Sequence, residues 1–309
     1  MNQIRKPAVD ALGATVLIIF SGLLGLNQAL VKLVNVGFSP VFQVGLRSLC
    51  AFFPVLLFAL IMKKRLSLSD GSLVPGFVSG LFFSLEFCLL FIALEYTSVA
   101  RVSVLFYTMP IWISLGGHFL IPGERLTAFR LGALMLAVLG IALALLDGDW
   151  STNPNSMIGD LLALAGSFCW AGIALIARTT QLSKSSPEMQ LLYQLFISAL
   201  LLVAIAPLFG NVIRDLTPMI IGIFTFQVFA IAAIGFVVWF WALSVYPASD
   251  MASFSLLAPI FGVFFGWLIF DDQLSPFLLI ALVLVAAGIA LINHDTSRRN
   301  KLITQEQKT

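Results

Sequence analysis

Apolar segments of about 20 residues follow one another along almost the whole chain, and a helix of that length crosses the core of a lipid bilayer. Hydrophobic residues make up 60% of the sequence and charged residues only 10%, whereas soluble domains are roughly 45–50% apolar and 25% charged. So few charges leave no room for a separate soluble domain. The sequence therefore predicts an all-α membrane protein, with nearly all of its function inside the bilayer.

Ten predicted spans fit these apolar segments. Several links between them, such as Glu95 to Ser98 and Asp271 to Leu274, are so short that the neighbouring helices must be antiparallel. The spans cover approximately residues 11–33, 39–62, 73–94, 99–121, 126–146, 158–179, 187–209, 217–243, 249–270 and 275–293. A polar tail follows at 295–309, which we expect in the cytoplasm.

The distribution of Lys and Arg predicts the orientation, because cytoplasmic flanks are enriched in both. With the N-terminus inside, thirteen of the 17 basic residues fall on the cytoplasmic side, three fall on the opposite side and one lies within a span. The three are Lys32, Arg101 and Arg214, and the one within a span is Arg47. Both termini are therefore expected in the cytoplasm. The asymmetry also supports ten spans, since a missed helix would reverse every later loop.

The two halves of the chain repeat one another. Ala93-Leu94 recurs as Ala242-Leu243 and Pro110 recurs as Pro259, both at a shift of 149 (242 − 93 and 259 − 110). The repeats, 1–147 and 157–294, each hold five spans, and because five is odd the second repeat enters the membrane with the opposite polarity. Two inverted five-helix repeats are typical of transporters that work by alternating access. A duplication kept only for packing is the alternative.

A set of short motifs resembles the EamA-type transporters of the drug/metabolite transporter superfamily. The matching residues are Leu24-Gly25-Leu26-Asn27 with Lys32, Pro40 with Arg47, Ala93 to Ser98 with Pro110, Gly123-Glu124-Arg125-Leu126, Leu139-Gly140-Ile141, Trp170 with Arg178, Pro187, Ala242-Leu243, Pro259 and Gly288. Leu24 replaces a tryptophan of the family pattern, and Gln194 stands where the second half would match Arg47 (194 − 47 = 147). The resemblance implies a bacterial-type inner-membrane carrier of small metabolites, often an exporter of amino acids or related compounds and often coupled to protons.

Polar residues from four predicted spans share one depth in the membrane. At 1.5 Å per residue, Arg47 and Glu86 each lie about 12 Å below the outer ends of their spans, and Asn27 and Gln28 lie about 8 to 9 Å below theirs. Tyr107 sits at a depth similar to that of Arg47. Clustering lets such groups offset the cost of an intramembrane charge. We expect this layer to bind the substrate or a coupling ion, although the amides of Asn27 and Gln28 could equally bridge helices.

Glu86 and Arg47 each have two interpretations. In the functional one, the Glu86 carboxyl exchanges a proton or meets a cationic group of the substrate, and Arg47 binds a carboxylate or phosphate. In the structural one, the two residues form a permanent ion pair that holds the second and third spans together. The sequence leaves both interpretations open.

Five further residues complete the predicted site and its proposed moving parts. Trp170, near the middle of its span, suggests an aromatic wall, with core packing as the alternative. Gln194 and Gln227 give the second half a neutral polar lining. Pro110 and Pro259 sit in mid-helix, where each is expected to remove a backbone hydrogen bond and bend its helix. The matched prolines suit a rocking hinge, and static kinks that widen a cavity are the alternative.

Other classes of function find little support in the sequence. It has neither a phosphate-binding glycine loop nor a His/Cys/carboxylate cluster with metal spacing, so we expect no enzyme activity, no cofactor and no metal. The basic residues flank the membrane, so no nucleic acid is expected as a partner. The predicted function is a secondary carrier, monomeric or homodimeric, that exports a small metabolite with proton or exchange coupling. Uptake of a metabolite or vitamin and a passive channel are the alternatives.

Overall fold

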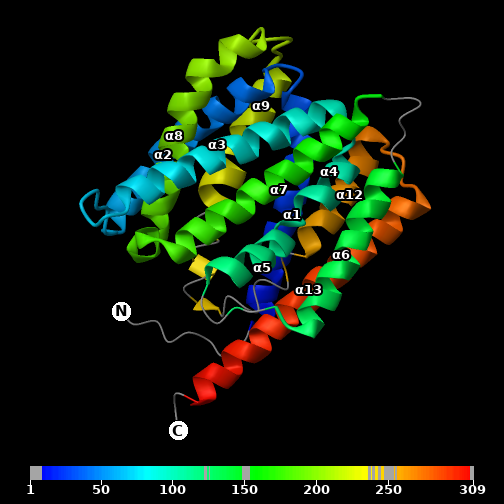
Figure 1. The fold of residues 1–309 in the computed structure, drawn as a ribbon. Helices are drawn as coiled ribbons and strands as arrows, with labels where there is room; N and C mark the ends of the chain where they lie inside the picture. The colour runs from blue at the N-terminus through cyan, green and yellow to red at the C-terminus, as the bar shows by residue number, and fades with distance from the viewer. Residues whose placement is uncertain are drawn as a thin grey trace.

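The computed structural model describes residues 9–121, 124, 126–147, 154–235, 238, 241–242, 245–246, 254 and 256–306, with side chains as far as 294. Within these ranges every regular element is a helix, and an isolated antiparallel bridge joins Phe38 to Ile213. The helices pack side by side in a bundle (Figure 1). The predicted all-α class is confirmed.

Six helices make up the first half of the bundle. They are α1 (Ala11–Val34), α2 (Pro40–Ile61), α3 (Leu73–Tyr96), α4 (Val99–Phe106), α5 (Met109–Leu120) and α6 (Ala128–Leu146). The second half contains α7 (Ser156–Thr179), η1 (Gln181–Lys184), α8 (Pro187–Ile205), η2 (Ala206–Phe209), α9 (Pro218–Phe226), the π-helical η3 (Gln227–Ile234), α12 (Leu257–Phe270) and α13 (Pro276–Glu306).

Four helices begin with the same local signal, a Ser or Thr followed by Pro. The hydroxyl oxygen caps the helix by accepting a hydrogen bond from the backbone N–H three residues on, and the proline fits the first turn because it has no N–H to leave unpaired. These starts are Ser39-Pro40 at α2, Ser186-Pro187 at α8, Thr217-Pro218 at α9 and Ser275-Pro276 at α13. The sequence itself therefore fixes where these helices begin.

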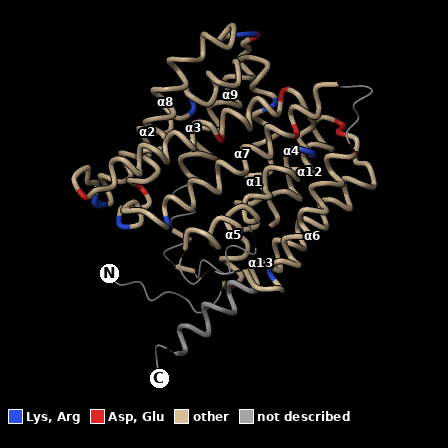
Figure 2. Tube along the Cα trace, viewed as in Figure 1, with Lys and Arg blue, Asp and Glu red and all other residues tan. Residues whose placement is uncertain are grey.

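Among the described residues, eight helical segments are long and apolar enough to cross a membrane, and the shorter apolar segments 218–234 and 257–270 accompany them. Most charged residues lie in loops and at helix ends (Figure 2). The described bounds fall close to those predicted from the sequence. The predicted end of the eighth span at 243 and start of the ninth at 249 lie outside the described residues. The last predicted span and the polar tail form one helix, α13, as far as Glu306.

The fourth predicted span is broken into two helices, although the sequence predicts one helix bent at Pro110. α4 ends at Phe106 and α5 begins at Met109, so Pro110 lies in the first turn of α5, where its missing N–H is tolerated. At the break the hydroxyl of Thr108 donates to the carbonyl of Leu105 at 2.6 Å. Pro259 likewise lies in the first turn of α12 and not in mid-helix. Both prolines therefore begin helices in the described structure.

Helices at equivalent positions of the two halves pack against each other. α2 packs on α8 and α6 on α13, which are pairs of equivalent helices, and α4 of the fourth predicted span packs on α12 of the equivalent ninth span. α3 also packs along α7. At the α6–α13 crossing, Gly140 lies against α13 and its repeat equivalent Gly288 (288 − 140 = 148) lies against α6. A Cβ at Gly140 would come within 2.9 Å of the carbonyl of Ala281, and one at Gly288 within 2.7 Å of the carbonyl of Ala133. Matched glycines thus allow these two backbones to touch.

Candidate substrate site

Arg47 is buried without an ion-pair partner among the described residues. It lies on α2 with 8% of its surface exposed, and its guanidinium carbon sits 4.4 Å from the ring centre of Phe87 and 4.9 Å from that of Phe91. Both rings belong to α3. Aromatic faces attract a guanidinium, and more strongly when water is excluded. The hydrogen-bonding edge of Arg47 therefore remains available for an anion.

Glu86 is a second buried charge close to Arg47. It lies on α3 with 3% of its surface exposed, close enough to Arg47 for the two charges to interact. Among the described residues no ion pair within 4.0 Å joins the two side chains, and both interpretations of this pair stay predictions. Gly166 of α7 packs against the backbone carbonyl of Glu86 and brings the second half up to this residue.

Tyr107 and Trp170 come together at the break between α4 and α5. Their rings meet edge to face with centres 6.0 Å apart, and Phe106 stacks on Trp170 at 5.2 Å. Trp170 is partly buried on α7, so this aromatic cluster joins the two halves of the bundle. Trp170 thus lies in a cluster of three rings beside the broken span, and its role as an aromatic wall of the site stays a prediction.

Asn27 and Gln28 face different neighbours because successive helical residues point about 100° apart. The side-chain carbonyl of Gln28 accepts a hydrogen bond from the hydroxyl of Ser103 on α4, and its amide nitrogen has no partner in the described part of the chain. The side-chain carbonyl of Asn27 is also buried and unpartnered there. The structure gives Gln28 a bridging bond and leaves one polar atom of each residue unused.

Gln194 and Gln227 both bridge helices. Gln194 on α8 donates from its amide to the hydroxyl of Ser79 on α3 at 3.1 Å. Gln227, at the start of η3, accepts from the amide of Gln43 on α2 at 3.4 Å. Gln43 was not singled out in the sequence, although it lies four residues before Arg47 and so on the same face of α2.

A buried ion pair that was not predicted from the sequence joins α4 to α7. The guanidinium of Arg101 on α4 donates to the Asp160 carboxylate of α7 from Nε at 3.1 Å and from Nη2 at 2.5 Å. Nη2 also reaches the carbonyl of Ala144, and the hydroxyl of Thr97 donates to Asp160 at 2.9 Å. Arg101 looked like a simple flanking charge in the sequence. The signal was that Asp160, near the start of the sixth predicted span, lies on the same side of the predicted membrane.

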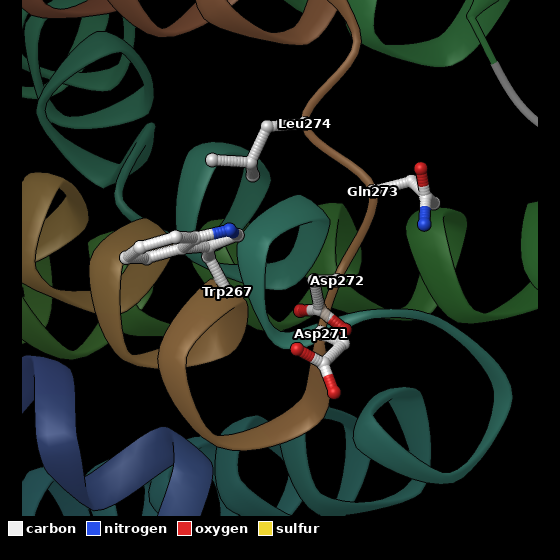
Figure 3. Close-up of a pocket in the computed structure, with 5 residues that line it drawn as sticks. All are labelled: Trp267, Asp271, Asp272, Gln273 and Leu274. Carbon is white, nitrogen blue, oxygen red and sulfur yellow. The ribbon is translucent and has the colours of Figure 1, made fainter.

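A surface hollow of about 320 Å³ lies at the end of α12, lined by Trp267, Asp271, Asp272, Gln273 and Leu274 (Figure 3). Asp271 ends α12 in the left-handed conformation. Asp272 accepts a hydrogen bond from the backbone N–H of Ala100 at 2.9 Å and so ties this loop to the first turn of α4. Partial burial raises the pKa of Asp272, while the N–H of Ala100 and the charge of Lys32 oppose the shift. These contacts make the hollow part of the junction between the two halves.

The described residues show no group of three or more His, Cys, Asp or Glu side chains that could hold a metal ion. The three cysteines are free thiols. Within the described part of the chain, the interior around the broken span offers the charges of Arg47 and Glu86, several amides and an aromatic cluster.

Comparison with known proteins gives these groups a family context. The sequence model of the EamA-like transporter family matches twice, over residues 11–146 and 157–294. The chain is 24% identical over 262 residues to the "Uncharacterized transporter YoaV" of Bacillus subtilis, covering 84% of this chain and 89% of that protein. It is 25% identical over 277 residues to a "Probable amino-acid metabolite efflux pump" of Escherichia coli, covering 86% of this chain and 89% of the relative.

A solved crystal structure shares the fold. It superposes with a TM-score of 0.63 at 19% sequence identity and covers 94% of this chain and 99% of the other. The two family matches together span most of the sequence, and they agree with the motifs and with the paired halves of the bundle. The chain belongs to the EamA-like transporter family and is a membrane transporter with many apolar helices.

Proposed function

We propose that the protein is a secondary active transporter that exports a small metabolite, an amino acid or a related compound, across the cytoplasmic membrane. The observation that carries the proposal is the presence of Arg47 and Glu86, two buried charges without an ion pair between them, within a bundle of this family. Unpaired charges inside a membrane are costly, so they mark sites where a substrate or ion binds. Export is supported by the name of the Escherichia coli relative, a "Probable amino-acid metabolite efflux pump".

In the proposed site, Arg47 binds the carboxylate of the substrate and Glu86 meets its ammonium group or exchanges a proton. The aromatic cluster around Tyr107 and Trp170 receives the apolar portion, because stacked rings offer apolar faces beside a polar layer. Asn27, Gln28, Gln194 and Gln227 complete the polar lining.

Alternating access between two inverted five-helix repeats, 1–147 and 157–294, is the proposed mechanism. Three observations support it: α2 packs on α8 and α6 packs on α13, each a pair of equivalent helices, and α4 of the fourth predicted span packs on α12 of the equivalent ninth span. Pairing of this kind is what a two-fold axis in the membrane plane would produce, and it permits two mirror-related arrangements of the halves. Pro110 and Pro259, which lie in the first turns of equivalent helices, are the proposed hinges.

Ten spans with both termini in the cytoplasm form the proposed topology. Its support is that each ion pair in the described residues joins loops or helix ends assigned to the same side. Arg178–Glu124 and Lys64–Glu188 lie at the cytoplasmic end, and Arg101–Asp160 and Arg214–Glu95 lie at the opposite end.

A reporter fused after Thr309 tests this topology. A fluorescent protein that matures only in the cytoplasm is expected to fluoresce there, and alkaline phosphatase, which folds only in the periplasm, is expected to stay inactive. Active phosphatase at the C-terminus would contradict the proposed topology.

Transport in proteoliposomes tests the role of Glu86. Glu86→Gln is expected to lower pH-gradient-driven movement of radiolabelled amino acids at least about tenfold, because an amide neither carries a proton nor pairs with an ammonium group. Glu95→Gln is the matched control, since Glu95 ends the same helix and pairs with Arg214 at the bundle surface. A well-folded Glu86→Gln protein with full gradient-driven transport would contradict the proposal that Glu86 couples transport to protons.

The same vesicles separate the proposed carrier from its alternatives. A carrier shows saturable exchange when unlabelled amino acid is loaded inside and labelled amino acid is added outside, whereas a channel shows linear flux without exchange. Reversing the imposed pH gradient distinguishes export from uptake by the direction in which label accumulates.

A further inference from the structure

Two glutamines meet in the apolar interior between the halves of the bundle. Gln43 lies one turn into α2, and Gln227 lies where α9 passes into η3. Each is 0% exposed. One hydrogen bond joins them, from the Gln43 amide nitrogen to the Gln227 side-chain oxygen at 3.4 Å. The contact between α2 and η3 is therefore made partly by amides in place of apolar side chains.

This bond leaves both side chains half satisfied. The side-chain oxygen of Gln43 and the amide nitrogen of Gln227 are buried without a partner in the described part of the chain. Turning both amides over would reverse the bond and again leave one donor and one acceptor unpaired. Buried polar groups in proteins are nearly always bonded, and no water is at hand in a bilayer core. The two unused atoms can therefore bond a group that both donates and accepts a hydrogen bond.

The position of this pair relates it to the proposed site. Gln43 precedes Arg47 by four residues, so the two share a face of α2 and lie about 6 Å apart along the helix axis. Arg47 has no anion partner among the described residues, as its guanidinium rests on the rings of Phe87 and Phe91. Gln227 begins a π-helical stretch, a geometry that occurs often at functional sites because its wider turn displaces side chains.

We infer that Gln43 and Gln227 form a subsite that recognises a hydroxyl or carboxamide group on a substrate whose carboxylate is bound by Arg47. A hydroxyl or an amide donates to the free oxygen of Gln43 and accepts from the free nitrogen of Gln227, which satisfies both orphaned atoms at once. An apolar group of the same size would leave both of these atoms without a hydrogen bond. A site that bonds a hydroxyl therefore discriminates against such an analogue. This inference rests on the proposed function and narrows its substrate class.

The other half of the chain offers a matched control. Gln190 on α8 is the repeat equivalent of Gln43 (190 − 43 = 147, as 187 − 40 = 147). Its amide is satisfied by the backbone carbonyls of Leu182 at 3.0 Å and Ser185 at 3.2 Å. Gln190 therefore has the same chemistry and the equivalent place in its repeat but no unused donor.

The test compares pairs of similar shape, threonine with valine and glutamine with methionine, in counterflow into proteoliposomes. Wild-type protein is expected to prefer the polar member of at least one pair by about tenfold in initial rate at low concentration, as one or two hydrogen bonds allow. Gln43→Met and Gln227→Met are each expected to reduce that preference to about twofold or less, mainly by slowing the polar member. Gln190→Met is expected to keep it.

Two outcomes would overturn the inference. One is a wild-type protein that moves the polar and apolar members of both pairs equally well, or moves none of the four. The other is a variant whose rates fall by the same factor for both members, which is what a purely structural amide bridge predicts. If Gln43→Met does not fold, as judged by size-exclusion chromatography, Gln227→Met tests the same subsite. The proposed function fails separately, through unchanged gradient-driven transport in Glu86→Gln, because that result does not depend on the preference between paired substrates.

Discussion

Replacing Asp160 by asparagine is expected to lower the free energy of unfolding by about 3–5 kcal/mol, because the change leaves a buried guanidinium without its counter-charge. Asp160 is 0% exposed and accepts from two nitrogens of Arg101 and from the hydroxyl of Thr97. The carboxylate of Asp147, 3.9 Å from Arg101, offers partial compensation and places the effect at the lower end of that range. Unfolding in mixed micelles with increasing dodecyl sulfate measures the change.

The control is Glu124→Gln, which removes the charge partner of Arg178. Both of those side chains are substantially exposed, and exposed pairs contribute about 0–1 kcal/mol. A double variant, Arg101→Leu with Asp160→Leu, should recover much of the lost stability, since it removes both buried charges together. Equal effects of Asp160→Asn and Glu124→Gln would show that the buried pair contributes no more than a surface pair.

Replacing Gly140 by alanine is expected to destabilise the fold by about 1–3 kcal/mol, because the added methyl group forces α6 and α13 apart. The new Cβ would lie 2.9 Å from the carbonyl of Ala281 and 3.0 Å from the backbone nitrogen of Val285. Backbone atoms cannot rotate away as a flexible side chain can. Gly288→Ala, on the facing helix, is expected to act in the same direction.

Gly132 provides the matched control on the same helix. A Cβ there meets nothing within 4 Å, so Gly132→Ala is expected to stabilise α6 by roughly 0.5–1 kcal/mol through reduced backbone freedom in the unfolded chain. The same micelle titration measures both variants. If Gly140→Ala matches or exceeds the stability of Gly132→Ala, the two helices do not depend on the close crossing.

The first residues of several helices were predictable from the sequence, because a helix start depends on residues that are adjacent along the chain. The pairs Ser39-Pro40 and Ser186-Pro187 combine a capping hydroxyl with a proline that suits the first turn, and the described helices begin there. Apolar length predicted α3 and α7 equally well. The halves could be recognised as repeats from short identical segments, which require no knowledge of tertiary contacts.

The break in the fourth span and the π-helical stretch at Gln227 could not be predicted from neighbouring residues in the sequence. A proline such as Pro110 is compatible with a kink or with a new helix start, and tertiary packing decides between them. The residues that contact Arg101 and Arg47 could not be predicted either, because those contacts also depend on tertiary packing. Depth along a helix is calculable from sequence, but the direction of a side chain around the axis is useful only when the neighbouring helices are known. Depth alone therefore grouped Arg47 with Glu86 and overlooked Gln43.

The break at Tyr107 and Thr108 has an electrical consequence for the bundle. An unbroken span keeps the partial charges of its two ends, about half an elementary charge each, at opposite surfaces of the membrane. Here the negative end of α4 and the positive end of α5 face each other inside it, and the hydroxyl of Thr108 contacts that of Ser167 on α7 at 3.0 Å. A polar solute at this level meets oriented backbone dipoles instead of hydrocarbon. We expect the dipoles at the break to offset part of the cost of bringing a polar group to this level, without another charged side chain in the membrane.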